Sequence, residues 1–210
     1  MLEKIEKEYI KMQKQYGNPN LDSITFGGCK ENPDICFVFM NPTRRNITAS
    51  KEWTGLKAPW IGTKNVWNLF HDLEIITDNL YKEIKSKPGK EWTPEFADRV
   101  YQEVENKKVY ITNLAKCTQE DARPLKDEVF KQYLDLFFKE IAIVRPKKVI
   151  LFGNQVSSIV LDQKISVSTV RKQEFLYHNF KFYPVYYPVG NGFFNIDKAI
   201  EDIKYIMNNC

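Results

Sequence analysis

The sequence predicts an α/β protein, a three-layer α/β/α sandwich around a central, mainly parallel four-stranded sheet. Short apolar runs rich in Val, Ile and Phe alternate along the chain with segments of helical periodicity. The runs have the length of buried strands, and turn residues such as Asn, Pro and Gly stand at their ends. Alternation of this kind places helices on both faces of a parallel sheet.

Length and composition indicate one globular domain. At 210 residues the chain can bury a sizeable core, and its 43% hydrophobic and 28% charged residues are ordinary for such a protein. No apolar stretch reaches the roughly 18 residues that span a membrane, and the charged start of the chain is typical of a helix. We therefore expect a cytoplasmic monomer with a single domain over 1–210, a helical extension over about 1–33 and an insertion over about 77–92.

Periodicity and turn residues predict the first half of the chain. Apolar and charged residues alternate at helical spacing over 1–16, and an Asn-Pro sequence then ends this helix. Thr93 and Pro94 suit a helix cap and a first helical position, which predicts a helix to about Asn106. Between these two helices we expect a strand at 34–40, a long connection over 41–63, a helix over 65–74 and an exposed lysine-rich linker over 77–92.

The second half continues the alternation of strands and helices. A long helix is predicted to begin at Asp127 and to end before Arg145, because a residue that precedes proline disfavours the helical conformation. The other expected elements are strands at 108–114 and 148–153, a helix over 154–161, a hairpin or an edge strand beside a core strand over 175–178 and 181–187, and a helix over 195–208.

Polar residues at the strand ends mark the expected functional edge. Asn41, Asn113, Gly153 and Tyr187 end the predicted strands, and open α/β sheets bind their ligands at the carboxyl ends of the strands. The segment 41–64 contains five basic residues and one acidic residue, a net charge of +4 that equals the charge of the whole chain. This concentration permits a polyanionic partner, and a solvated loop is the alternative.

The four cysteines follow no pattern of metal binding or of disulfides. Cys29, Cys36, Cys117 and Cys210 include no pair at Cys-x-x-Cys spacing. Cys36 lies within the first predicted core strand, where a reduced and buried thiol is expected. The sequence therefore predicts no metal and no other cofactor.

Four blocks of residues stand at or soon after the predicted strand ends. They are Phe39-Met40-Asn41-Pro42, Ala58-Pro59-Trp60-Ile61-Gly62, Tyr110-Ile111-Thr112-Asn113-Leu114-Ala115-Lys116-Cys117 with Arg123-Pro124, and Tyr187-Pro188-Val189-Gly190. In this order they resemble the uracil-DNA glycosylase superfamily over roughly 34–207. The first block is similar to the mismatch-specific branch. The second and third are similar to the iron–sulfur branch, and the third is the most specific match.

Two positions depart from the superfamily's pattern. Cys117 alone stands at a place of the four cluster cysteines, so the resemblance implies no iron–sulfur cluster in this chain. Tyr187 stands where the superfamily usually has a histidine, and the mismatch-specific branch has an asparagine there. The loss of histidine therefore does not abolish the chemistry within the superfamily.

The resemblance implies a DNA glycosylase that removes uracil or another deaminated base from DNA, as in base-excision repair. Asn41 would position the attacking water, and Tyr187 would donate a hydrogen bond to the leaving base. Trp60 would stack on the extruded base, while Met40 and Asn113 would complete the base-binding site. The residues expected to contact nucleic acid are Arg44, Arg45, Lys116, Arg123, Gly190, Asn191, Gly192 and Phe193.

Other interpretations of these residues remain open. Asn41 and Asn113 also suit turns at strand ends, and Trp60 suits a loop side chain that packs on the core. Phe193, or its neighbour Phe194, suits either the core or a wedge between bases. The whole chain also suits a nucleic-acid-binding module without catalysis, or a hydrolase of small nucleosides. The basic segment argues against the hydrolase, because small substrates do not need extended phosphate contacts.

Overall fold

The computed structural model describes residues 1–123 and 125–209, and for Asn191 the backbone alone. In chain order its elements are α1 (Leu2–Tyr16), β1 (Phe26–Gly28), β2 (Ile35–Phe39), η1 (Ile47–Ala49), α2 (Val66–Asp72), α3 (Asp78–Ser86), η2 (Gly89–Glu91), α4 (Pro94–Asn106), β3 (Val109–Asn113), α5 (Asp127–Lys131), α6 (Leu134–Val144), β4 (Lys148–Phe152), α7 (Asn154–Val160), η3 (Val167–Thr169), β5 (Phe175–Tyr177), β6 (Phe180–Val185), η4 (Gly190–Asn195) and α8 (Ile196–Asn209). Among the described residues, no helix combines the length and the apolar character needed to cross a membrane.

The strands form one sheet in the order β1-β3-β2-β4-β6-β5. Strands β3, β2, β4 and β6 are parallel, and the edge strands β1 and β5 are antiparallel to their neighbours. Every residue of β2 is buried, as expected for an apolar run in the middle of a parallel sheet. The carboxyl ends of the four parallel strands therefore meet at one edge.

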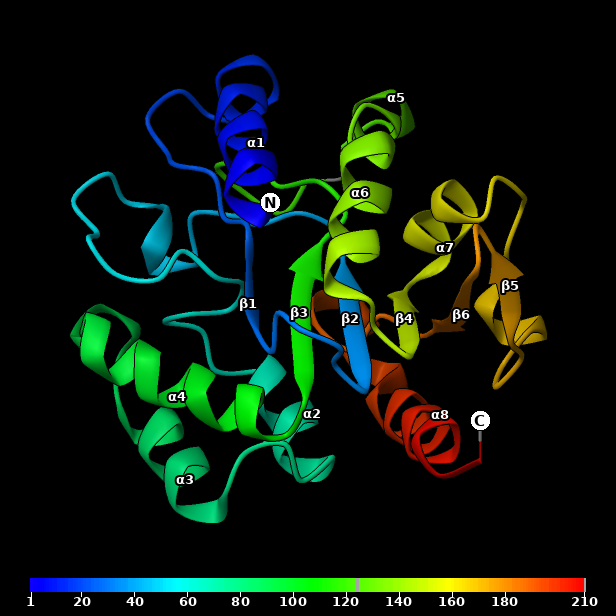
Figure 1. Cartoon of the computed structure of the whole chain (residues 1–210). Helices are drawn as coiled ribbons and strands as arrows, with labels where there is room; N and C mark the ends of the chain where they lie inside the picture. The colour runs from blue at the N-terminus through cyan, green and yellow to red at the C-terminus, as the bar shows by residue number, and fades with distance from the viewer. Residues whose placement is uncertain (124, 210) are drawn as a thin grey trace.

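Helices cover both faces of this sheet, which gives the predicted three layers (Figure 1). Phe37 and Phe39 of β2 face the layer of α2, α3, α4 and α8, whereas Cys36 and Val38 face the layer of α1, α6 and α7. The ring of Phe39 stacks on that of Phe152 in β4 with centroids 4.4 Å apart. Aromatic rings thus fill the core next to the carboxyl edge.

Local signals in the sequence explain where several helices begin and end. Thr93 caps α4, since its side chain accepts a hydrogen bond of 3.2 Å from the Phe96 amide, and Pro94 follows at the first helical position. Arg145 ends α6 in the left-handed conformation, with φ of 57°, directly before Pro146. Both boundaries agree with the sequence-based prediction.

The sheet differs from the predicted one in size and type. The sequence predicts four mainly parallel strands, and the structure has six in a mixed sheet. The four parallel strands are the predicted ones. The antiparallel edge strand β5 agrees with the hairpin or edge strand expected over 175–178, so β1 is the unpredicted strand. Strand β1 contains three residues and pairs on one side only, so it is too short to show an alternating pattern in the sequence.

Two helical predictions are also corrected. Residues 77–92 are not an exposed linker, because they form α3 and η2 and bury Leu80 and Ile84 in the core. The long helix expected from Asp127 is two helices, α5 and α6, which are separated near Tyr133. The ring of Tyr133 is fully buried, so the break brings an aromatic side chain into the core.

Candidate functional site

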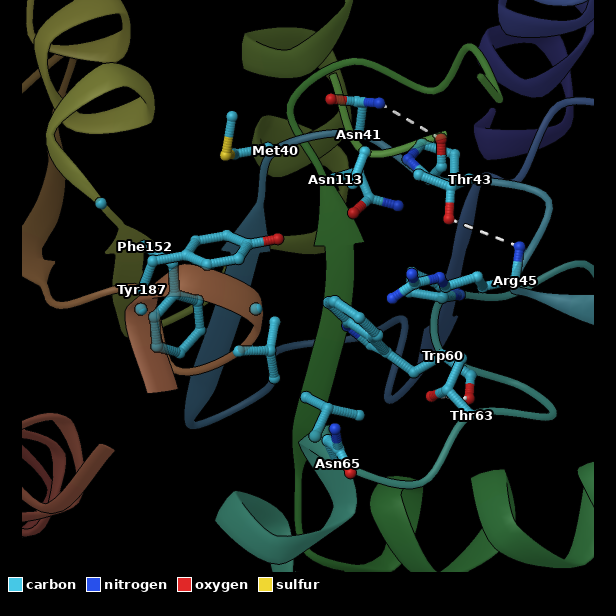
Figure 2. Close-up of a pocket in the computed structure, with 18 of the residues that line it drawn as sticks. Met40, Asn41, Thr43, Arg45, Trp60, Thr63, Asn65, Asn113, Phe152 and Tyr187 are labelled. Carbon is cyan, nitrogen blue, oxygen red and sulfur yellow. Dashed lines mark hydrogen bonds between the residues drawn. The ribbon is translucent and has the colours of Figure 1, made fainter. Parts of the chain in front are cut away.

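A pocket with a volume of about 1140 Å³ opens at the carboxyl edge of the sheet (Figure 2). The ends of all four parallel strands reach it through Asn41, Asn113, Gly153 and Tyr187, so these strand ends meet at one edge, as predicted. The other lining residues are Met40, Pro42, Thr43, Arg45, Asn46, Pro59, Trp60, Gly62, Thr63, Lys64, Asn65, Val66, Ala122, Arg123, Phe152, Asn154, Gln155, Val167, Tyr186, Val189, Gly190, Gly192 and Asn195.

The charged residues of the described pocket lining are all basic. Its charged side chains are Arg45, Lys64 and Arg123, and it contains no Asp, Glu or His. Three cations without a carboxylate favour an anionic ligand. The same composition lacks the side chains that usually act as a general base near neutral pH.

Asn113 ends β3 and lines the inner part of the pocket. The residue is 2% exposed, and its amide nitrogen Nδ2 is buried without a hydrogen-bond partner in the described part of the chain. A turn asparagine would use this amide on nearby backbone, so the turn interpretation does not account for Nδ2. A buried donor without a partner costs about 1–3 kcal/mol, and a carbonyl oxygen of a ligand would remove this cost.

Asn41 lies beside Asn113, two residues beyond the end of β2. Backbone pairing continues past both strands, since the Leu114 amide donates to the Phe39 carbonyl at 2.8 Å and the Ala115 amide donates to the Met40 carbonyl at 3.0 Å. The Asn41 amide nitrogen donates to the carbonyl of the next residue at 3.2 Å, as a turn asparagine does. This bond leaves the side-chain oxygen Oδ1 available as an acceptor.

Trp60 forms one wall of the pocket in a strained backbone conformation. Its φ is 70°, in the left-handed region that bulky residues rarely adopt. The indole packs edge-on against Phe39 with centroids 4.9 Å apart, so the side chain touches both the core and the pocket. Its Nε1 is buried and unpartnered within the described residues. Backbone strain at a pocket wall is typical of a functional position.

Tyr187 follows β6 on the side of the pocket opposite Trp60 (Figure 2). Its ring meets that of Phe39 edge-on at 6.2 Å between centroids. In Figure 2 its hydroxyl points toward the space beside Asn113. Burial raises the pKa of the Tyr187 phenol above its ordinary value, so the hydroxyl stays protonated and can donate a hydrogen bond.

The turn after Tyr187 brings backbone close to the pocket. A Cβ on Gly192 would lie 2.0 Å from the Tyr187 carbonyl oxygen, so only glycine fits there. Gly190 has φ of 59° and also lines the pocket. The side chain of Asn191, expected to contact nucleic acid, lies outside the described part of the chain.

Two phenylalanine side chains lie exposed in the same turn. Phe193 is 48% exposed and Phe194 is 93% exposed, although both are large apolar residues. The interpretation that these rings join the core is therefore wrong for Phe194. A contact with a partner at this edge would bury apolar area that the protein alone leaves in water.

The basic residues expected to contact nucleic acid differ in their positions. Arg45 and Arg123 line the pocket, whereas Arg44 is exposed outside its lining. Arg44 pairs with Glu120, and Arg123 pairs with Asp121 at 2.9 Å. Exposed ion pairs of this kind contribute little, so a phosphate can replace either carboxylate. No ion pair of Arg45 is recorded among the described residues.

The prediction that Lys116 contacts phosphate is wrong. Its side chain is fully buried and forms an ion pair of 2.9 Å with Glu140, which is also fully buried. Lys116 also donates to the main-chain carbonyl of Asn113. The lysine therefore supports the pocket from behind and does not reach its surface.

Several pocket residues carry no signal that would single them out in the sequence. Thr63 and Asn65 stand before α2, and Asn154 and Gln155 begin α7 directly after Gly153. Polar residues of these types are common at helix starts in any protein. Only the position of Asn154 and Gln155 after a predicted strand could have placed them at the functional edge.

Among the described residues, no three His, Cys, Asp or Glu side chains lie together in a way that could hold a metal ion. Cys117 is buried, and its sulfur accepts a hydrogen bond of 3.6 Å from the Gln119 amide. His71 of α2 pairs with Asp78, the first residue of α3, at 2.7 Å near the surface.

The chain matches a known protein family. The model described as the Uracil DNA glycosylase superfamily matches residues 26–197, which is more than half of the chain. The matched range contains the strand ends and all of the pocket-lining residues.

The raised pKa of Tyr187 gives a pH prediction. The ultraviolet absorbance of tyrosinate, compared between the wild-type protein and Tyr187→Phe, should show no difference in ionisation until the pH exceeds about 10, the ordinary tyrosine value. Far-ultraviolet circular dichroism defines the pH range in which both proteins stay folded. A difference that develops below about pH 10 would show that the phenol ionises normally and would remove the argument for a permanent donor.

Proposed function

Because the chain belongs to the uracil DNA glycosylase superfamily, we propose that it hydrolyses the N-glycosidic bond of uracil, or of another deaminated base, in DNA. Membership supports a glycosylase-like function and DNA as partner in general. The observation that carries the specific proposal is the buried, unpartnered amide of Asn113 inside a basic pocket. We take the working form to be a cytoplasmic monomer.

Base capture is the first step of the proposal. A base can enter the pocket only after it leaves the helical stack, at a cost of a few kcal/mol that is lowest for a mispaired base. Stacking of the base on the Trp60 indole offsets about 1–3 kcal/mol of this cost. The Asn113 amide nitrogen then donates to a ring carbonyl, which deaminated bases carry in place of an amino group. Met40 closes the pocket beside them.

The chemical step follows from the two remaining side chains. The bond between C1′ and the base nitrogen breaks with its electron pair on the base, while water adds to C1′ and the proton that this water loses passes to the base through solvent. The side-chain oxygen of Asn41 accepts a hydrogen bond from this water and positions it. The neutral Tyr187 hydroxyl donates to the base carbonyl, where negative charge develops. The products are an abasic site and the free base.

Binding of the DNA strand uses the rim of the pocket. Arg45 and Arg123 line the rim and suit phosphate groups, and Arg44 is exposed nearby. Phe193 and the strongly exposed Phe194 suit the space that an extruded base leaves in the duplex. Both contacts would favour a long polyanion over a free nucleoside.

One observation favours a second candidate, a nucleic-acid-binding module that does not cleave. The described pocket lining contains no Asp, Glu or His, so the site positions water without a residue suited to take its proton. A carboxamide and a phenol together give slow catalysis at best. Binding of the base would survive the loss of the reaction, because Trp60 and Asn113 do not depend on it.

An excision assay separates the two candidates. Oligonucleotides that carry uracil, hypoxanthine, xanthine or a G·T mismatch are incubated with the protein, and the abasic sites are then cleaved. The wild-type protein should produce abasic sites from at least one substrate. Asn41→Ala should lower the single-turnover rate by about 100-fold or more, because the water loses its position, while DNA affinity changes little.

The matched control for this variant is Asn208→Ala, which removes an exposed asparagine of α8 outside the pocket lining. Its excision rate should equal that of the wild type. If the wild-type protein binds DNA in a salt-dependent manner but yields no abasic product from any substrate, the enzyme proposal is wrong and the binding module stands.

The rim residues give a prediction for DNA affinity. Arg45→Ala should reduce the slope of log K against log salt concentration by about one, since one phosphate contact is lost. Fluorescence anisotropy of a labelled oligonucleotide over a salt series measures this slope. Arg99→Ala, which removes an exposed arginine of α4 that pairs with Glu83, should leave it unchanged. Equal slopes for all three proteins would exclude Arg45 from phosphate binding.

A further inference from the structure

Helix α1 lies outside the range matched by the superfamily model, which begins at residue 26. Two of its buried side chains nevertheless form hydrogen bonds behind the pocket: Gln13 with the backbone of Thr118, in the segment after β3, and Tyr9 with Glu140 of α6. We propose that α1, through Gln13 and Tyr9, is a positioning element that fixes Asn41 and Asn113 in the site. This inference rests on the proposed function only where its test measures excision of a base.

Gln13 connects α1 to the segment that follows β3. The residue is 4% exposed, although glutamine is usually a surface residue. Its Nε2 donates to the carbonyls of Asn18, Leu21 and Thr118 at 3.0, 3.1 and 3.4 Å. Its Oε1 accepts from the Thr118 amide at 2.7 Å. The amide oxygen and nitrogen of this side chain are thus both bonded to backbone.

Gln119 connects the segment after β3 to the turn that contains Asn41. The Gln119 amide donates to the Pro42 carbonyl at 3.0 Å, and the Arg44 amide donates to the Gln119 carbonyl at 2.9 Å. Its side chain donates to the carbonyl of Tyr16, the last residue of α1, at 2.8 Å. The backbone around Asn41 is therefore held from the side of α1.

Tyr9 holds a second connection, which leads to Asn113. Its hydroxyl donates to Glu140 of α6 at 2.6 Å, and α1 lies beside α6 in Figure 1. The Glu140 carboxylate also accepts from Tyr110 at 3.1 Å and from Thr112 at 2.7 Å, and it pairs with Lys116 at 2.9 Å. Four donors thus surround one fully buried carboxylate.

Lys116 completes this connection behind the pocket. Its ammonium group donates to the main-chain carbonyl of Asn113, whose side chain lines the pocket. The ammonium also lies 4.6 Å from the centre of the Tyr9 ring. A buried ion pair is weak support for stability, because apolar residues of similar size often serve as well. Its position directly behind Asn113 is better explained by the placement of that residue.

The test compares Gln13→Leu with Lys11→Ala, which changes an exposed residue of the same helix. Leucine fills the space but removes the acceptor of the Thr118 amide and the donor to the Leu21 carbonyl, while the Asn18 and Thr118 carbonyls keep their backbone bonds. Amide hydrogen exchange is measured at Ala115 and Gln119, with Ile150 in the central strand β4 as reference. Exchange should accelerate by about tenfold at the first two amides and stay unchanged at Ile150, and Lys11→Ala should match the wild type.

Steady-state excision supplies the second readout. For Gln13→Leu, kcat should fall by about 10- to 100-fold while KM changes little, because the reacting groups lose their geometry and the phosphate contacts remain. Wild-type exchange at Ala115 and Gln119 would overturn the inference. Equal acceleration at Ile150 would also overturn it, because the role would then be purely structural.

A second variant keeps the inference testable if Gln13→Leu does not fold. Tyr9→Phe retains the ring, which stacks on Tyr133 at 6.0 Å, and removes only the bond to Glu140. Exchange at Leu114 and Ala115 should rise by about threefold or more, and unchanged exchange there would count against the second connection. Exchange does not depend on catalysis, so a protein without glycosylase activity would refute the proposed function and leave this test intact.

Discussion

The parallel pairing of β2 with β3 is the constraint on which the site depends. Ile35 lies opposite Val109, and the register continues without a break to Phe39 opposite Asn113. Because side chains alternate along a strand, a slip of one residue would turn Asn113 away from its present face. The pairing continues as two further backbone bonds beyond the strands, so Asn41 and Asn113 leave the sheet side by side. The other residues that line the pocket lie around this edge.

The pocket offers hydrogen-bond donors and cations, and its described lining has no acidic side chain. The Asn113 amide, the neutral Tyr187 hydroxyl and the Arg45 guanidinium all suit oxygen atoms of a ligand. Phe39 and Phe152 support them with stacked rings from the core. Such a site suits the stabilisation of developing negative charge that we propose, and the absence of acidic side chains and histidine from its described lining limits its acid–base chemistry.

The sequence predicts the parallel strands and the pocket edge well, because both depend on local patterns. A buried strand that stops at an asparagine needs only a few neighbouring residues to be recognised. Lys116 shows where prediction from local patterns fails, since a lysine in a polar segment is expected at the surface. Its partner Glu140 lies on another helix, and only the fold brings the two charges together. Helix α3, within 77–92, was missed for a related reason: its lysines mask the spacing of Leu80 and Ile84.

The central claim is that this pocket receives a base extruded from DNA. The most direct measurement is a crystal structure of the Asn41→Ala protein with a duplex that carries one uracil. We expect uracil outside the duplex, stacked on Trp60, with a ring carbonyl within hydrogen-bond distance of the Asn113 amide. A uracil that stays stacked in the duplex, or DNA bound away from the carboxyl edge of the sheet, would contradict it.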